Sequence, residues 1–298
     1  MSQSLHRIIA IAGPTAVGKT DLAIAVATHL QVPILSFDSR QCYRELCIGV
    51  ARPTAEQLQL VPHFFIADHS IEEPVSAAYY ESYAAKKVAS LIAQYGQVVM
   101  VGGTGLYWKA FWEGLDEIPA VDPSVRAAIA EQYQQEGMQW LEQTLAALDP
   151  EYAAAGEMLN PQRMMRALEV VRSTGKSILF FQKGRVKQQP YMVKGIGLQL
   201  PRAELDRRIE RRVDLMMEQG LLEEVRALEK YKNLNALNTV GYKELFEYFK
   251  EDISLPQALQ QIKLHTRQYA KRQLTWFKKD PLFQWFEPGQ KDKILASL

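Results

Sequence analysis

Short apolar runs alternate with helical periodicities along the first third of the chain. The run Ile8–Ala12 ends at a Gly-Pro pair and is followed by TDLAIAVATHL, in which apolar residues recur at helical spacing. Two further runs, VPILSFD and QVVMV, lead into Asp38 and into the pair Gly102 and Gly103. Buried strands that alternate with helices predict an α/β fold, in which helices flank a parallel sheet and functional loops lie at the carboxyl ends of its strands.

The pattern changes from about Pro119. Long amphipathic helical patterns follow, with no strand between them, over residues 121–148 and 160–176. A strand pattern returns once, at residues 193–200, and residues 205–231 are then predicted to form one strongly periodic helix. Because no linker rich in Pro, Gly and Ser separates these parts, we expect one core with an α-helical insertion domain. The expected core is 1–117 with 190–298, and the expected insertion is 118–189.

Charge and cysteine content narrow the functional classes. Among 298 residues, 35 Lys and Arg balance 34 Asp and Glu, so any nucleic-acid surface must be a local patch. Two cysteines, Cys42 and Cys47, are too few for a zinc site or a disulfide framework. The amino-terminal residues lack the apolar region of a signal peptide, and no stretch approaches the roughly 20 apolar residues of a membrane span. We therefore expect a cytoplasmic protein that does not enter the membrane.

The segment Gly13–Thr20, GPTAVGKT, matches the phosphate-binding P-loop pattern. It follows a predicted strand and precedes a predicted helix, which is the context that this motif requires. Glycines let backbone amides approach phosphate oxygens, Lys19 adds a positive charge, and the Thr20 hydroxyl is suited to bind Mg²⁺. The fold is therefore expected to be P-loop NTPase-like, although a glycine-rich turn that binds nothing would share the pattern.

The remainder of an NTPase site is incomplete in the sequence. Such enzymes place an acidic residue after a second apolar strand to hold Mg²⁺, whereas QVVMV leads into Gly102, Gly103 and Thr104. The acid at a strand end near the P-loop is Asp38. Three roles remain open for Asp38 at this point: a magnesium ligand, a general base, or a cap of the next helix.

Two clusters of basic residues are candidates for RNA contact. Arg267, Lys271 and Arg272 alternate with Tyr269 and Trp276, and basic residues beside aromatic rings suit unpaired RNA. In NPQRMMRALEV, two arginines three residues apart share one helix face beside a glutamine, as a phosphate or base clamp would. A solvated helix face and surface salt bridges are the plain alternatives for these clusters.

Seven segments together resemble one family, the tRNA dimethylallyltransferases, also called tRNA isopentenyltransferases or IPP transferases. They occur in the family's order between residues 8 and 279 and read GPTAVGKT, DSRQCYRELCIG, VPH, VGGTGLYWKA, NPQRMMRALEV, VGYKE and TRQYAKRQLTWF. A P-loop alone is common to many families, but this series is not. The zinc-finger extension of eukaryotic members does not follow these segments in the sequence, so we expect the bacterial type.

The resemblance implies a reaction and its donor site. A dimethylallyl group would pass from dimethylallyl diphosphate to the exocyclic 6-amino group of the adenosine just 3′ of the anticodon, in tRNAs that read codons beginning with U. Mg²⁺ would be the cofactor, bound by Thr20. The residues implied to bind the diphosphate are Gly13, Pro14, Thr15, Ala16, Val17, Gly18, Lys19, Thr20 and Arg212. Asp38 would be the general base, with Thr104 and Arg126 as the other catalytic residues.

The resemblance also implies how tRNA binds. The target adenine would be flipped out of its stack, and the helical insertion would grip the anticodon stem-loop. The implied tRNA-binding residues are Asp38, Ser39, Arg40, Gln41, Thr104, Arg126, Gln162, Arg163, Met164, Met165 and Arg166. Residues 47–53 read CIGVARP where many members read DIGTAKP, which removes a carboxylate and a hydroxyl near the site.

Two other functions use the same residues. A P-loop kinase of a nucleoside or small metabolite would transfer phosphoryl from ATP, and the acid missing after QVVMV disfavours it. A non-catalytic RNA-binding protein could retain the fold, and the presence of Lys19, Thr20 and Asp38 disfavours that reading. We expect the protein to be a monomer.

Overall fold

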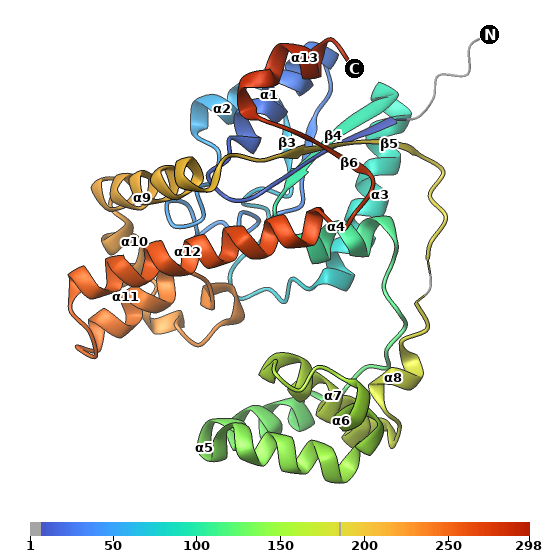
Figure 1. Ribbon diagram of the computed structural model, residues 1–298, viewed down its shortest axis with the longest axis vertical. Coiled ribbons are helices and arrows are strands. Elements are labelled where there is room, and N and C mark those ends of the chain that lie inside the picture. The colour runs from blue at the N-terminus through green and yellow to red at the C-terminus, as the bar shows by residue number, and fades with distance from the viewer. Residues whose placement is uncertain (1–6, 185) are drawn as a thin grey trace. The chain divides into compact units, whose positions relative to one another are not determined.

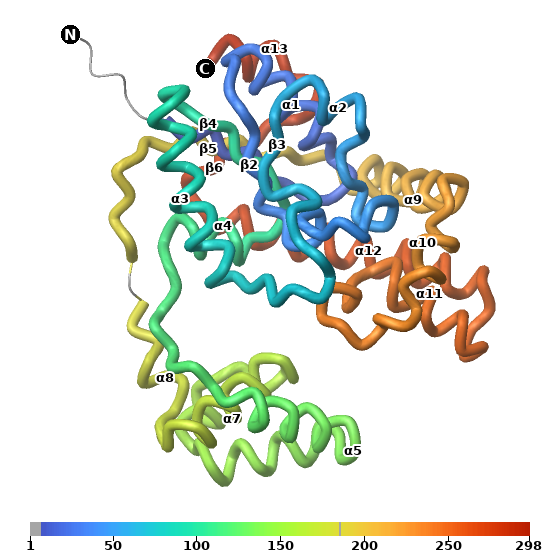
Figure 2. Tube along the Cα trace, turned by 180° about the vertical axis from the view of Figure 1, so that it is seen from behind, coloured from blue at the N-terminus to red at the C-terminus, as the bar shows by residue number. Residues whose placement is uncertain are grey.

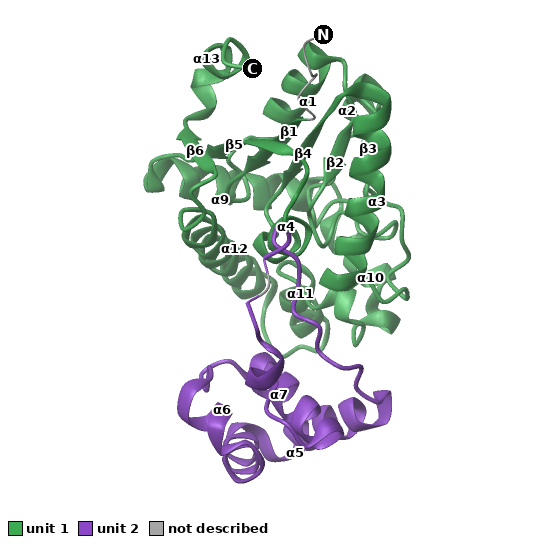
Figure 3. Cartoon of the chain, turned by 90° about the vertical axis from the view of Figure 1, so that its right-hand side faces the viewer, with its two compact units in different colours: residues 1–112, 188–298 green, residues 113–187 purple. Residues whose placement is uncertain are grey.

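The computed structural model describes residues 7–184 and 186–298, and the chain divides into two compact units (Figure 3). Unit 1 is formed by residues 1–112 and 188–298, and unit 2 by residues 113–187. The first six residues of the core expected from the sequence lie outside the described part. The chain leaves unit 1 once and returns to it once, which is the connectivity of an inserted domain.

A six-stranded sheet forms the centre of unit 1 (Figure 1). The strand order is β3-β2-β4-β1-β5-β6, and all of these neighbours pair in parallel. The strands are β1 (Arg7–Ala12), β2 (Ile34–Ser36), β3 (His63–Phe64), β4 (Gln97–Gly102), β5 (Met192–Leu198) and β6 (Phe283–Phe286). Because β1 lies between β4 and β5 and is covered on both faces, its sequence is a continuous apolar run instead of an alternating one. The α/β prediction is confirmed.

Helices of unit 1 follow the strands and pack around them (Figures 1 and 2). The α-helices are α1 (Lys19–Leu30), α2 (Ala55–Leu60), α3 (Ala77–Tyr95), α4 (Gly105–Trp112), α9 (Arg202–Glu218), α10 (Leu221–Ala227), α11 (Tyr242–Phe249), α12 (Leu255–Phe277) and α13 (Lys291–Leu295). Short 3₁₀ turns cover Glu229–Tyr231, Asn235–Leu237 and Pro288–Gln290. Among the described residues, no helix has the length and apolar character that a membrane span requires.

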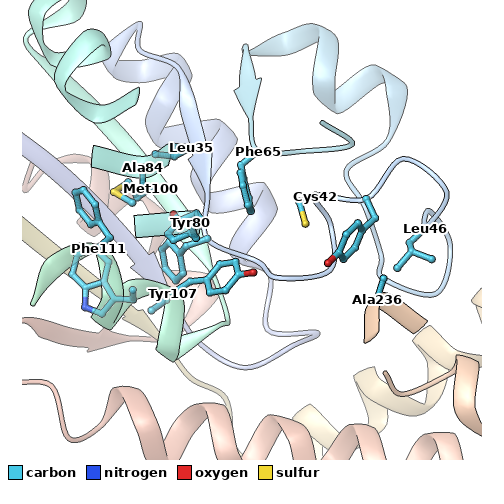
Figure 4. Close-up of a cluster of buried hydrophobic side chains, with 14 of the residues drawn as sticks. Leu35, Cys42, Leu46, Phe65, Tyr80, Ala84, Met100, Tyr107, Phe111 and Ala236 are labelled. Carbon is cyan, nitrogen blue, oxygen red and sulfur yellow. The ribbon is translucent and has the colours of Figure 1, made fainter. Parts of the chain in front are cut away.

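Alternating side chains of β1 supply two hydrophobic cores, one on each face of the sheet. Ile9 and Ile11 pack in a cluster with the apolar face of α1. Ile8 and Ala10 belong to the other cluster, with side chains of α3, α4 and α10–α12. Part of this second core is aromatic, and Figure 4 shows Tyr80 and Tyr107 within it, where their rings stack with centroids 4.5 Å apart. The two cores fix the strand ends, and therefore the loops that follow them.

Unit 2 consists of helices around a small core of its own. Its helices are α5 (Pro123–Leu148), α6 (Pro150–Ala155), α7 (Pro161–Thr174) and α8 (Ile178–Phe181). The core includes Ile129 and Leu141 from α5 and Leu168 from α7, all fully buried. Asp122 and Asn160 cap the amino termini of α5 and α7 by accepting hydrogen bonds from backbone amides.

The structure differs in three local details from what the sequence patterns show. The single helix expected over 205–231 is divided into α9 and α10 at Gly220, whose φ of 98° interrupts helical geometry. The long pattern over 121–148 bends at Gly137, which has φ 74° and ψ −160°. The sheet also gains β6 after α12, because Phe283 and Phe286 bury their rings against the core while Gln284 between them is exposed.

Candidate functional site

The P-loop connects β1 to α1 at the carboxyl edge of the sheet. Gly13 has a φ of 151°, and a Cβ atom at that position would lie 2.6 Å from the carbonyl oxygen of Leu198. The loop can pass this close to β5 only because glycine has no side chain. Gly18, with φ 101°, then begins α1, so the unpaired amides of the first helical turn follow the loop directly.

Positive charge is concentrated around this loop. Lys19 donates a hydrogen bond from Nζ to the carbonyl oxygen of Pro14 at 2.7 Å, and Arg212 of α9 donates from Nη1 to Oγ1 of Thr15 at 3.1 Å. Burial lowers the pKa of Lys19 to about 7, against the opposing effect of Asp38, while Arg212 lowers it further. Burial also lowers the pKa of Arg212. Two basic groups held close together in partly buried positions make a site that binding of a multiply charged anion would stabilise.

Asp38 lies two residues beyond β2, in a turn that its own carboxylate stabilises. Oδ1 accepts hydrogen bonds from the backbone amides of Arg40 and Gln41, at 2.9 and 3.3 Å. Oδ2 has no hydrogen-bond partner among residues 7–184 and 186–298. Asp38 borders the same cleft as Lys19, and its carboxylate raises the pKa of that lysine. The residue therefore has one oxygen fixed by the turn and one oxygen available for chemistry.

A chain of hydroxyl groups lies beside Asp38. The Ser39 amide donates to Oγ1 of Thr104 at 3.0 Å, and the Thr104 hydroxyl donates to the Ser39 hydroxyl at 3.2 Å. Tyr269 of α12 interacts with Thr104, and burial raises the pKa of the tyrosine. These contacts hold together the ends of β2 and β4, which are neighbours in the sheet.

Gln273 of α12 connects the P-loop to the end of β4. Its Oε1 accepts from the amide of Thr15 at 2.8 Å, and its Nε2 donates to the carbonyl oxygen of Gly103 at 2.9 Å. The Gln273 side chain is buried; its bond to Gly103 forms out of water and its bond to the Thr15 amide is partly buried. A Cβ atom on Gly103 would lie 2.1 Å from Nε2 of Gln273, which explains the second glycine of the VGGTG segment.

These groups line one cleft of about 1400 Å³ in unit 1. The P-loop and α1 contribute Thr15, Lys19 and Thr20, and α9 contributes Arg208, Arg211 and Arg212. The other walls come from the Asp38 turn, the loop 48–53, the end of β4, the start of α11 and one side of α12. Cations at one end and a free carboxylate oxygen within the same cleft suit a reaction that displaces an anionic leaving group.

Comparison with known proteins identifies the relatives of this arrangement. The family model described as IPP transferase matches residues 41–280. The chain belongs to the IPP transferase family. It is 43% identical over 291 residues to tRNA dimethylallyltransferase 1 of Bacteroides thetaiotaomicron, covering 98% of this chain and 94% of that protein. It is 45% identical over 286 residues to tRNA dimethylallyltransferase of Christiangramia forsetii, covering 96% and 95%.

Solved structures of IPP transferases have the same fold. The full-length tRNA isopentenylpyrophosphate transferase of Bacillus halodurans superposes with a TM-score of 0.71 at 33% identity, covering 98% of this chain and 95% of that one. The Staphylococcus epidermidis enzyme gives 0.69 at 32% identity, with coverages of 98% and 97%. A eukaryotic dimethylallyltransferase gives 0.74 at 23% identity and supports the fold alone. The resemblance inferred from the motifs is therefore confirmed.

The structure assigns structural contacts to two residues of the IPP transferase DSRQ segment that were expected to bind tRNA. The Arg40 guanidinium donates to the carbonyl oxygens of Asn235, Ala236 and Asn238, at 2.8 to 3.2 Å. The side-chain amide of Gln41 donates to the carbonyl oxygens of Val50 and Ala51. Both side chains hold neighbouring loops in place, and all four residues of the segment, Asp38 to Gln41, line the cleft.

The basic stripe on α12 is also divided. Arg267 pairs with Glu210 of α9 at 2.8 Å, so its charge is locally balanced. Arg272 and Trp276 line the cleft, and Trp276 is 39% exposed. Tyr269 also lines the cleft and is partly buried, beside Thr104. The face of α12 directed into the cleft therefore carries one cation and one exposed indole.

The remaining expected residues of this IPP transferase lie in unit 2. Glu169 is buried and accepts from Arg126 at 3.2 Å and from Arg166 at 3.0 Å, so one carboxylate holds both guanidinium groups. Arg163 pairs with Glu157 at the surface. Met164 is fully buried in the core of unit 2 and has no surface to offer RNA, which corrects the expectation for that residue. Gln162 is exposed and Met165 is partly buried.

Sequence reasoning missed two buried or partly buried polar residues of the site. Gln273 occupies a buried position on an otherwise apolar helix face, and that polar interruption was the signal that could have drawn attention to it. Glu224 of α10 binds three backbone amides of the loop after Leu46. Glu224 falls within residues 205–231, which were expected to form one helix, so the missed helix boundary concealed its position.

Proposed function

We propose that this chain transfers the dimethylallyl group of dimethylallyl diphosphate to the exocyclic amine of an adenosine in tRNA, as a tRNA dimethylallyltransferase of the IPP transferase family. The observation that carries the proposal is the shared cleft. The P-loop cations and the free oxygen of Asp38 border the same space, and the carboxylate is close enough to raise the pKa of Lys19. The adenosine would be the one 3′ of the anticodon, in tRNAs that read codons beginning with U.

The donor's diphosphate suits the P-loop end of the cleft. Backbone amides, Lys19 and Arg212 would bind its oxygens and stabilise the charge that develops as it leaves. Mg²⁺ usually binds through one or two protein oxygens, several waters and substrate phosphates. The described residues contain no cluster of three His, Cys, Asp or Glu that could hold a metal ion, but the Thr20 hydroxyl lines the cleft at the start of α1. These residues fit a Mg²⁺ ion that arrives with the diphosphate and neutralises part of its charge.

The proposed reaction is a displacement at an allylic carbon. The adenine N6 attacks C1 of the dimethylallyl group, the new C–N bond forms, and the C–O bond to the diphosphate breaks with its electron pair leaving on oxygen. Asp38 Oδ2 takes the proton that N6 loses, while Oδ1 stays bound to the amides of its turn. Thr104 would orient the amine or the carboxylate, because its hydroxyl lies next to Ser39 beside that turn.

Unit 2 is proposed to bind the anticodon stem-loop. Arg126 is 60% exposed while Glu169 fixes its Nε, so the remaining guanidinium donors are available for a phosphate. We expect Arg126→Ala to weaken tRNA binding and to reduce the slope of log affinity against log salt by about 1. The control is Arg172→Ala, because Arg172 stacks on Trp140 with 5.7 Å to the ring centroid. Equal salt slopes for wild type and Arg126→Ala would refute this contact.

The test of the function is direct transfer of label. Purified protein, Mg²⁺ and dimethylallyl diphosphate labelled in the allyl group are incubated with unmodified tRNA, with and without ATP. Label that enters RNA equally well without ATP supports the proposal. Label that never enters RNA, together with ATP-dependent phosphorylation of a small molecule, would refute it and point to a P-loop kinase. Binding of tRNA without transfer would indicate an RNA-binding protein on the same fold.

A further inference from the structure

Glu224 binds a loop of the cleft through an unusual number of hydrogen bonds. Its Oε2 accepts from the backbone amides of Cys47 and Ile48, at 3.1 and 2.8 Å, and its Oε1 accepts from the amide of Gly49 at 3.0 Å. The Tyr242 hydroxyl donates to Oε1 at 2.5 Å. One carboxylate from α10 therefore receives four donors, three of them consecutive amides.

Consecutive amides that converge on one point form an anion-binding concavity in a protein backbone. Here the anion is a side chain of the same molecule, and bonds from N–H groups to a carboxylate are about twice as strong as those between neutral groups. The backbone also packs closely at this point, since a Cβ atom on Gly49 would lie 2.6 Å from the ring of Tyr242. Glu224 and Tyr242 together fix the loop backbone from two sides.

The loop held by Glu224 is a wall of the cleft and leads back to Asp38. Ile48 and Val50 are partly buried and line the cleft. Beyond them, the Gln41 side chain donates to the carbonyl oxygens of Val50 and Ala51, at 3.1 and 2.9 Å. The backbone amide of Gln41 in turn donates to Oδ1 of Asp38. Hydrogen bonds, joined by the backbone of the loop and by Gln41 itself, thus connect the Glu224 carboxylate to the turn that orients the proposed base.

We propose that Glu224 is a positioning residue for the transfer step, acting through the loop 47–51 and Gln41 on the carboxylate of Asp38. The inference rests on the proposed function, because it concerns how the Asp38 carboxylate of the same site is positioned. The P-loop is held by other residues. Its Thr15 is bonded to Gln273 and Arg212, and its Pro14 carbonyl oxygen accepts from Lys19, so none of these contacts involves Glu224. Loss of Glu224 should therefore impair transfer while donor binding is retained.

The test compares Glu224→Gln with Glu223→Gln, its exposed neighbour on α10. The glutamine keeps the size of the side chain but directs an NH₂ group at backbone amides, so at least one bond to the loop is lost. We expect kcat/KM for tRNA to fall about tenfold or more, with the affinity for an unreactive donor analogue within about twofold of wild type. Glu223→Gln should match wild type in both measurements.

Tyr242→Phe provides an independent variant that removes only the hydroxyl from this arrangement. It should lower kcat/KM for tRNA by a smaller factor than Glu224→Gln does. If Glu224→Gln does not fold, Tyr242→Phe alone tests the inference. The inference is overturned if both variants transfer as fast as wild type, or if donor affinity falls in parallel with transfer, which would indicate general unfolding. Inactivity of the wild-type protein would instead refute the proposed function, so the two failures are distinguishable.

Discussion

Replacement of Asp38 by asparagine distinguishes the role of this residue as a base from its role in stabilising the turn. Oδ1 accepts the amides of Arg40 and Gln41, and an asparagine carbonyl oxygen at the same position can accept both bonds. The substitution changes only the second oxygen, Oδ2, into an NH₂ group with no basic lone pair. Asp38→Asn should therefore preserve the local backbone and abolish proton abstraction.

The expected size of this effect follows from the chemistry of general bases. A positioned base contributes about 10²- to 10⁴-fold to a rate, equivalent to about 3–5.5 kcal/mol in activation free energy. We expect kcat for Asp38→Asn to fall within this range when label transfer is followed under saturating donor and tRNA. Donor affinity is measured separately, because the Asp38 carboxylate raises the pKa of Lys19. Without that negative charge, a smaller fraction of Lys19 is protonated.

A second variant distinguishes the base from the turn. Asp38→Ala loses both the base and the two bonds to the turn, so it should be at least as slow as Asp38→Asn and should also lower the thermal stability slightly. If Asp38→Asn retains more than about a tenth of the wild-type kcat, Asp38 is not the base, since that loss is below the range for general-base catalysis. Asp38 would then serve the turn alone.

Further predictions concern the donor end of the cleft. Donor affinity of the wild type should weaken as pH rises above about 7, because Lys19 is then neutral in the donor-free protein and binding must take up a proton. Calorimetry measures donor affinity for wild type and Lys19→Met between about pH 6 and pH 9. Titration of the donor affects both proteins equally, so the difference between them reports Lys19, and identical pH profiles would contradict this reasoning. Gln273→Leu should lower the free energy of unfolding by about 2–6 kcal/mol, because the Thr15 amide and the Gly103 carbonyl each lose a hydrogen-bond partner at about 1–3 kcal/mol. Thermal denaturation checks this, and a loss as small as that of Gln260→Leu, an exposed position on the same helix, would argue against it.

Much of the fold follows from local patterns that the sequence displays. The runs at β1 and β4 are apolar because both faces of a central parallel strand are covered, and that requirement is visible without coordinates. The P-loop is equally local, since strand, glycine turn and helix are contiguous in the chain. The division at Gly220 was missed because a single glycine within a periodic pattern is compatible with both a continuous and a broken helix, and only the surrounding packing selects its φ of 98°.

The sequence by itself determined the chemical groups of this protein: a phosphate-binding loop, an acid after a strand, and a series of motifs that identifies the family. Tertiary structure alone decided which partners the other polar side chains have within the protein. The family resemblance implies that Arg40 and Gln41 bind tRNA, and the fold shows that their side chains also donate to backbone carbonyl oxygens, which for Arg40 lie 195 to 198 residues further along the chain. Gln273 lies within the TRQYAKRQLTWF segment and Glu224 lies in none of the seven segments, and the roles of both depend on backbone amides that only folding brings within their reach. A buried donor or acceptor must find a partner, and sequence spacing does not reveal which partner the fold will provide.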